Sequence, residues 1–144
     1  MNENDIHYLE KALSNEKNED IVNETFQEID KNKENILNEL ELSKKDTKIL
    51  LKKLEDYKYI DEFPDLQIGR YIRWINLNNH ENIKLTTGGI LCDIKMDDSI
   101  ALVFKNNMNR FFQINMDEAL VFQRLSEQER IILYAICYVN KSTK

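Results

Sequence analysis

Residues 69–77 read GRYIRWINL, and this stretch decides the fold. It is rich in β-branched and aromatic residues and begins with a glycine, which predicts a β-strand. Residues 100–104 read IALVF, a short and wholly apolar run that is typical of a buried strand. The second half of the chain is therefore expected to form a β-sheet.

Three further strands are predicted around these two. Residues 83–86 and 89–96 form one of them, and the Gly88-Gly89 pair that they flank predicts a bulge or a sharp bend inside this strand region. Tight turns are predicted at 97–99, which read Asp-Asp-Ser, and at 106–109, where three Asn residues tolerate a left-handed backbone. Strands at 110–116 and 119–124 complete the set, although a helical turn is an alternative for the last. Five short strands joined by tight turns favour a small, closed or nearly closed β-barrel.

The first half of the chain predicts helices instead, because it is dense in Glu, Lys and Leu and has no glycine before residue 69. A weak helix is predicted within 1–18 and a stronger one over 20–41. Ser43 and Asp46 resemble a capping box that opens another helix, which is expected to end near Tyr59. The last two helices predict an antiparallel hairpin or a short coiled coil. The apolar seam that would form a helical interface consists of Val22, Phe26, Ile29, Ile36 and Leu40.

Charge divides the chain near Pro64, its single proline. Residues 1–65 carry 10 Lys against 18 Asp and Glu, whereas residues 66–116 carry 6 basic and 4 acidic side chains. We therefore predict an acidic helical region at 1–63 and a barrel with a C-terminal helix at 64–140. Ser126 and Glu129 form the capping box that opens this last helix. The predicted fold class is α+β, with a helical hairpin, a five-stranded barrel and a C-terminal helix.

Composition indicates an AT-rich genome. The chain has 17 Asn, 17 Ile and 15 Lys, the amino acids whose codons are richest in A and T. Such a bias favours Lys over Arg wherever a bare positive charge suffices, yet five arginines are present, all after residue 69. We interpret them as positions that need the planar guanidinium for bidentate or stacked contacts.

Motifs of catalysis and metal binding are missing from the sequence. It contains no GxSxG, GxxxxGK[ST], HExxH or GxGxxG pattern. His7 and His80 are interpreted as solvated surface residues, and Cys92 and Cys137 as buried free thiols of a reducing compartment. The sequence therefore predicts a protein that is not an enzyme and has no cofactor and no metal site.

Basic and aromatic residues interleave along the predicted strands, which is typical of proteins that bind single-stranded nucleic acid. The alternative is that the aromatic rings fill the barrel and that the arginines pair with Asp93 or Asp117. Strict alternation places Ile72 and Trp74 on one face, and Tyr71 and Arg73 on the other. The predicted binding residues are Arg70, Tyr71, Arg73, Trp74, Lys84, Lys105, Arg110 and Phe112, with Phe111 beside them.

Two resemblances rest on these stretches. GRYIRWI at the first strand, followed by Gly-Gly before the second, resembles the opening of SH3-like barrels of the Tudor and KOW kind over residues 67–125. Taken together, GRYIRWINL, TTGGILCDIK, KNNMNRFFQI and VFQRLSEQE also resemble small uncharacterised proteins of nucleocytoplasmic large DNA viruses. The second resemblance agrees with the AT-rich composition and implies a viral setting without an assigned activity.

The function predicted first is that of a non-catalytic adaptor, which recruits a protein partner or assembles into a larger viral complex through its acidic helices, self-association included. The alternative is a nucleic-acid-binding barrel in viral transcription, genome packaging or RNA handling. The net charge of −6 weakens this alternative, because little counterion release is gained. Apolar runs of about 20 residues and a secretion signal are both missing, so we expect no membrane partner and an intracellular site: host cytoplasm, viral factory or virion.

Overall fold

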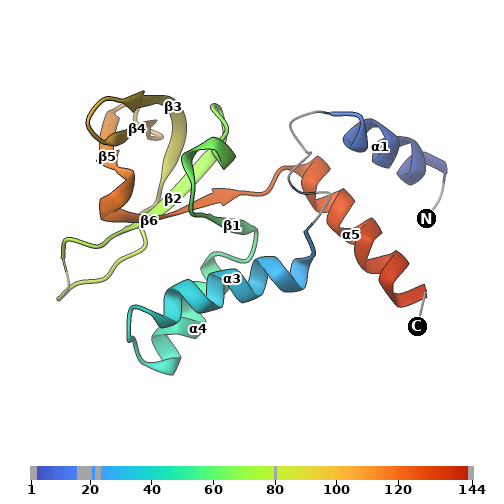
Figure 1. Ribbon diagram of the computed structural model, residues 1–144, viewed down its shortest axis with the longest axis horizontal. Helices are drawn as coiled ribbons and strands as arrows, with labels where there is room; N and C mark the ends of the chain where they lie inside the picture. Colours follow the sequence, from blue (N-terminus) through green and yellow to red (C-terminus); the bar gives the residue numbers. More distant parts are fainter. Residues whose placement is uncertain (1–2, 16–20, 22–23, 80, 143–144) are drawn as a thin grey trace. The chain divides into compact units, whose positions relative to one another are not determined.

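The computed structural model describes residues 3–15, 21, 24–79 and 81–142 (Figure 1). This part of the chain contains four α-helices and six strands, with a helix at each end, which confirms the predicted α+β class. The chain forms two compact units. The helical unit combines Met1–Glu41 with Leu125–Lys144, and the sheet unit is Leu42–Arg124. The helices are α1 (Glu3–Leu13), α3 (Phe26–Asn38), α4 (Lys44–Lys53) and α5 (Glu127–Ser142).

All six strands belong to one open antiparallel sheet with the order β1-β6-β2-β3-β4-β5. Two short 3₁₀ helices, η2 (Phe63–Asp65) and η3 (Met116–Glu118), precede β2 and β6 (Figure 1). The strands are β1 (Tyr57–Ile60), β2 (Tyr71–Asn76), β3 (Gly89–Met96), β4 (Ile100–Lys105), β5 (Phe111–Asn115) and β6 (Ala119–Arg124).

Strand β1 corrects the prediction of five strands. The helix that was expected to reach Tyr59 ends at Lys53, and residues 57–60 pair with β6 instead. Two tyrosines and an isoleucine in four residues prefer extended backbone, and pairing with a neighbouring strand satisfies their backbone groups. The sheet has β1 and β5 at its open ends within the described chain, so a closed five-stranded barrel is not confirmed.

Local signals in the sequence were more reliable. Ser43 Oγ accepts a hydrogen bond of 3.1 Å from the Asp46 amide at the start of α4. Ser126 and Glu129 form the reciprocal capping box of α5, with hydrogen bonds of 2.8 and 3.1 Å. Asn109 has φ of 59° in the turn before β5, so the left-handed turn is also confirmed.

Each unit has its own core. In the sheet unit the buried cluster includes Ile72, Trp74, Leu102 and Phe104, and the Trp74 and Phe104 rings stack with centroids 4.5 Å apart. In the helical unit α1 lies beside α5 (Figure 1). The buried side chains of that cluster are Ala12, Ile21, Ile29, Leu125, Ile132 and Leu133.

Charge is distributed very unequally between the units. The helical unit has 7 Lys and Arg against 14 Asp and Glu, whereas the sheet unit has 13 against 12. The boundary predicted at Pro64 lies inside the sheet unit. Helix α3 belongs to the helical unit and α4 to the sheet unit, so the predicted hairpin of these two helices stays a prediction.

Candidate binding sites

The two faces of β2 separate the predicted binding residues. Ile72 and Trp74 belong to the core of the sheet unit, whereas Tyr71 and Arg73 lie on the opposite face. Only 8 % of the Trp74 surface is exposed. Trp74 is therefore a core residue, as the alternative interpretation of the aromatic residues expected.

Tyr71 and Arg73 hold the segment that leads into β3. The Tyr71 hydroxyl donates to the Thr87 carbonyl at 2.6 Å, and Arg73 Nε donates to the Thr86 carbonyl at 2.8 Å. Gly88 follows with φ of +88°, and a Cβ there would lie 2.2 Å from the carbonyl oxygen of Ile72. Gly88 therefore has a backbone that favours glycine, and a side chain there would meet the Ile72 carbonyl, whereas the register shift of β3 lies between Leu91 and Asp93 and not at the glycine pair.

Three other predicted binding residues, Arg70, Lys84 and Arg110, have separate surroundings. The Arg70 guanidinium donates to Gln67 Oε1 at 2.9 Å and to the Arg124 carbonyl, so it ties the start of β2 to the end of β6. Lys84 is exposed in the loop before β3, and Arg110 is exposed in the turn before β5. Among the residues that the structure describes, neither Asp93 nor Asp117 forms an ion pair with an arginine.

One row of side chains crosses the whole sheet on the face opposite the core. The register pairs Tyr57 with Arg124, Tyr71 with Ile90, and Lys105 with both Ile90 and Phe111. Residues paired across antiparallel strands project to the same side, and the β2–β6 register brings Arg124 beside Tyr71. We call this set the basic-aromatic row: Tyr57, Arg124, Tyr71, Ile90, Lys105 and Phe111.

The row is most open at the β5 end. Phe111 is 65 % exposed and Ile90 is 46 % exposed, whereas Tyr57 is buried. Burial raises the pKa of Tyr57, and the Arg73 and Arg124 guanidiniums lower this pKa in part, so both charges lie near its phenol. Tyr71, Lys105 and Phe111 were predicted from the sequence. Tyr57, Ile90 and Arg124 were not, since strand pairing, which brings them into the row, leaves no local signal.

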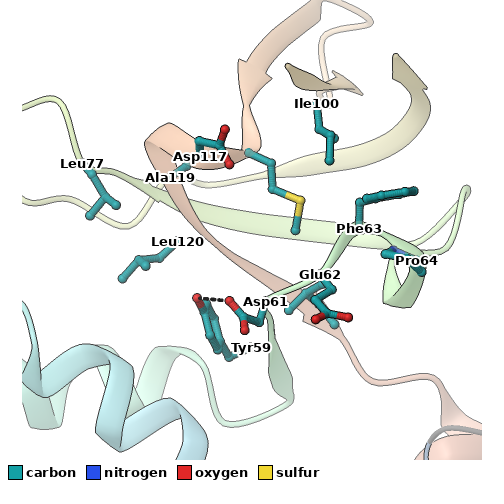
Figure 2. A pocket seen from close by; sticks show the side chains of 12 residues that line it. Tyr59, Asp61, Glu62, Phe63, Pro64, Leu77, Ile100, Asp117, Ala119 and Leu120 are labelled. Atoms are coloured by element: carbon teal, nitrogen blue, oxygen red, sulfur yellow. Dashed lines mark hydrogen bonds between the residues drawn. The ribbon is translucent and has the colours of Figure 1, made fainter. Parts of the chain in front are cut away.

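A cavity of about 470 Å³ lies at the other end of β6 (Figure 2). Its walls come from β1, the segment that follows it, η3, and the first residues of β4 and β6. Ile60, Met116 and Leu120 are among its lining residues, and all three are buried. The Tyr59 hydroxyl lies 3.4 Å from Asp61 Oδ1, a weak hydrogen bond. No local pattern in the sequence indicates this cavity, because its walls come from segments far apart in the chain.

A groove of about 590 Å³ runs between α1 and α5 in the helical unit. Tyr134 and Tyr138 line it and are each 60 % exposed. The pKa of Tyr8 is raised, mainly by desolvation and to a smaller extent by the nearby Glu127 carboxylate. We call this site the tyrosine groove; it is lined by Asn4, Asp5, Tyr8, Glu127, Ile131, Tyr134, Ala135 and Tyr138.

The predicted helical seam is in part internal. Ile29 is 2 % exposed within the core of the helical unit, and the Phe26 ring meets Tyr134 edge-on with centroids 5.0 Å apart. Ile36 and Leu40 are half-buried, whereas Val22 lies outside the described residues. The buried face of α3 runs through Ile29, Lys33 and Leu37, so Ile29 cannot meet a partner without unfolding.

Among the described residues no three His, Cys, Asp or Glu side chains lie close enough together to hold a metal ion. Cys92 and Cys137 are free thiols and half-buried rather than buried. His7 is exposed on α1, and His80 lies outside the described residues. None of the described helices has both the length and the apolarity that crossing a bilayer requires.

Comparison with family models, curated proteins and solved structures yields no match to this chain.

Proposed function

We propose that this protein is a non-catalytic adaptor that recruits a protein partner through the tyrosine groove. The observation that carries this proposal is the exposed stripe of α5. Ile131, Tyr134 and Tyr138 recur at i, i+3 and i+7 and line the groove rather than the core. Tyrosines carry much of the binding energy in protein interfaces, because a rigid ring buries a large area at small entropic cost.

Charge indicates the chemistry of the partner. The two charged residues of the groove, Asp5 and Glu127, are both acidic, and the helical unit has twice as many acidic as basic side chains. A groove between two helices suits an amphipathic helix that lays its apolar side chains into it. The partner segment that fits is therefore a helix with an apolar stripe and a basic rim.

A designed peptide tests this proposal. The probe is a helical peptide of leucine and lysine about four turns long, roughly 14 residues, and its control has glutamate in place of lysine. We expect titration calorimetry to detect the lysine peptide alone. Tyr138→Ser should remove about 2 kcal/mol of binding, roughly a 30-fold higher Kd. Met96→Ser, at an exposed position of the sheet unit, is the matched control. Equal binding of both peptides, or no binding of either, would contradict the proposal.

A second candidate function, nucleic-acid binding, is favoured by the basic-aromatic row. Arg124 and Lys105 stand beside Tyr71, Ile90 and Phe111 on one face, and bases can stack on exposed rings while cations contact phosphates. Against it, the sheet unit has a surplus of only one basic side chain. The 260/280 nm absorbance ratio of protein purified at low salt gives a first test. Binding of oligothymidylate should then weaken with salt, and Arg124→Ala should reduce the salt slope by about one, unlike Arg110→Ala.

We also propose that β2 to β6 form an SH3-like arrangement. Support comes from their spatial order, β6-β2-β3-β4-β5, and from the 3₁₀ helix η3 between β5 and β6. Closure into a barrel predicts that β5 amides that do not bond to β4 are protected from hydrogen exchange. Fast exchange at these amides would contradict closure.

The viral setting remains part of the proposal. The AT-rich composition and the resemblance to proteins of large DNA viruses support an adaptor that works inside an infected cell. Affinity purification from such a cell, with wild-type protein and Tyr138→Ser side by side, tests it. Viral proteins captured by the wild type and lost from the variant are the expected result.

A further inference from the structure

The cavity beside β1 has the form of a small-molecule site. Its volume of about 470 Å³ is typical of ligand pockets, which lie between roughly 300 and 1,000 Å³. All its lining residues belong to the sheet unit. Its lining residues include the apolar Ile60, Met116 and Leu120, all three buried, and the aromatic Tyr59 and Phe63. The apolar part of a ligand can therefore be buried in this cavity, out of contact with water.

Charge around this cavity has one sign. Asp61 and Glu62 lie on the side formed by the segment after β1, and Asp117 lies on the other side (Figure 2). The twelve lining residues include no Lys, Arg or His. Among the described residues none of these three carboxylates forms an ion pair. Like charges around a cavity repel anions, and a bound cation relieves the repulsion between them.

From this geometry we infer that the cavity binds an apolar cation, an alkylammonium whose chain enters the cavity and whose charge stays among the carboxylates. The Tyr59 and Phe63 rings add a cation–π contact where the ammonium approaches a ring face. Two sources supply this chemistry: a free alkyl amine and the side chain of a lysine on a partner. The inference does not depend on the tyrosine groove, since every lining residue belongs to the sheet unit.

The experiment compares three probes of equal chain length on the full chain: hexylamine, hexanol and hexanoate. Amide chemical shifts in NMR titrations give the affinity and the place of binding. We expect hexylamine to shift the amides of residues 60–63 and 117–120, hexanol to bind several-fold more weakly, and hexanoate not to bind. Equal binding of hexylamine and hexanol, or hexylamine shifts outside these two segments, would overturn the inference.

Charge variants then test the carboxylates. Glu62→Gln and Asp117→Asn keep the shape of each side chain and should each weaken hexylamine about two- to fivefold, as partly screened surface charges do. Asp98→Asn, in the exposed turn between β3 and β4, is the matched control. Unchanged affinity in both cavity variants would contradict the inference.

The source of the ammonium is decided by a fourth probe, Nα-acetyl-lysine N-methylamide. If it binds at the same amides as strongly as hexylamine, the natural ligand is a lysine side chain. If hexylamine alone binds there, the natural ligand is a free amine. Both results support an alkylammonium site.

Discussion

Tyr71 in the sheet unit and Tyr134 in the helical unit both belong to amphipathic elements, yet the fold uses them differently. The Tyr71 hydroxyl is committed to the Thr87 carbonyl, and its ring packs close to Gly88. Tyr134 touches Phe26 with one edge and leaves most of its surface open. Tyr71, in the stretch of sequence that decides the fold, therefore has a structural role. Tyr134 is largely exposed and belongs to α5, for which the sequence predicted no binding site.

The units also differ in what their charges do. In the sheet unit Arg70 and Arg73 donate to backbone or side-chain oxygens, so these cations organise loops. In the helical unit acidic residues outnumber basic ones twofold, so this unit has a net negative charge. Arginines whose guanidinium groups bond to loop oxygens contribute to stability, whereas the net charge of a surface contributes to the choice of binding partner. The following variants test this division, from the largest expected effect to the smallest.

Ile29→Asp should unfold the helical unit. The side chain lies in the core with Ala12 and Ile132, and a buried, unpaired carboxylate costs several kcal/mol. We expect a loss of helical circular dichroism. An outcome in which the protein stays folded and light scattering reports a smaller species would instead show that α3 forms an interface between copies. Ile36→Asp, on the half-buried side of α3, is the control.

Trp74→Ala should cost about 3–5 kcal/mol, because it empties the core where the indole stacks on Phe104. At about 4–8 °C per kcal/mol, Tm should fall by more than 10 °C. Phe111→Ala, at the exposed end of the basic-aromatic row, should change stability by less than about 0.5 kcal/mol. Equal losses from the two variants would mean that Phe111 is also structural.

Gly88→Ala should destabilise the sheet unit by about 2 kcal/mol or more, because it combines positive φ with a clash against the Ile72 carbonyl. Gly69→Ala is a matched control, since its φ is +92° but nothing lies within 4 Å of its added Cβ. It should cost only the conformational strain, about 1 kcal/mol. Chemical denaturation of both variants measures the difference. Similar losses would show that the close approach at Gly88 relaxes.

Arg73→Lys should cost about 1 kcal/mol, since a lysine has no donor at the position of Nε to bond to the Thr86 carbonyl. Arg110→Lys should stay within about 0.5 kcal/mol, because that side chain is exposed. The melting temperatures of the two variants, compared with that of the wild type, measure these two losses of stability. A stable Arg73→Lys protein would return Arg73 to the candidates for ligand contact.

The sequence predicted what depends on neighbours in the chain. The caps at Ser43 and Ser126, the turn at Asn109 and the buried strand at 100–104 all formed as expected. Each of these features depends on side chains only a few residues apart, so a short stretch of sequence is enough to predict it.

The prediction from the sequence was wrong where contacts between distant segments determine the structure. Leu50, Leu54 and Tyr57 have helical spacing, so Tyr57 was assigned to a helix; pairing with Arg124, far along the chain, made it a strand residue instead. The same pairing creates the cavity beside β1 and extends the basic-aromatic row. Strand order cannot be read from local periodicity, and both sites depend on it.

The division of the chain has a consequence for biosynthesis. The helical unit is assembled from two separated segments, with the sheet unit continuous between them. On the ribosome every strand emerges before α5 does, so we expect the sheet unit to fold first while α1 waits for its neighbour. A nascent chain that stops after Arg124 would keep all strands yet lack the tyrosine groove. Recruitment through that groove would then be restricted to chains whose translation has passed α5.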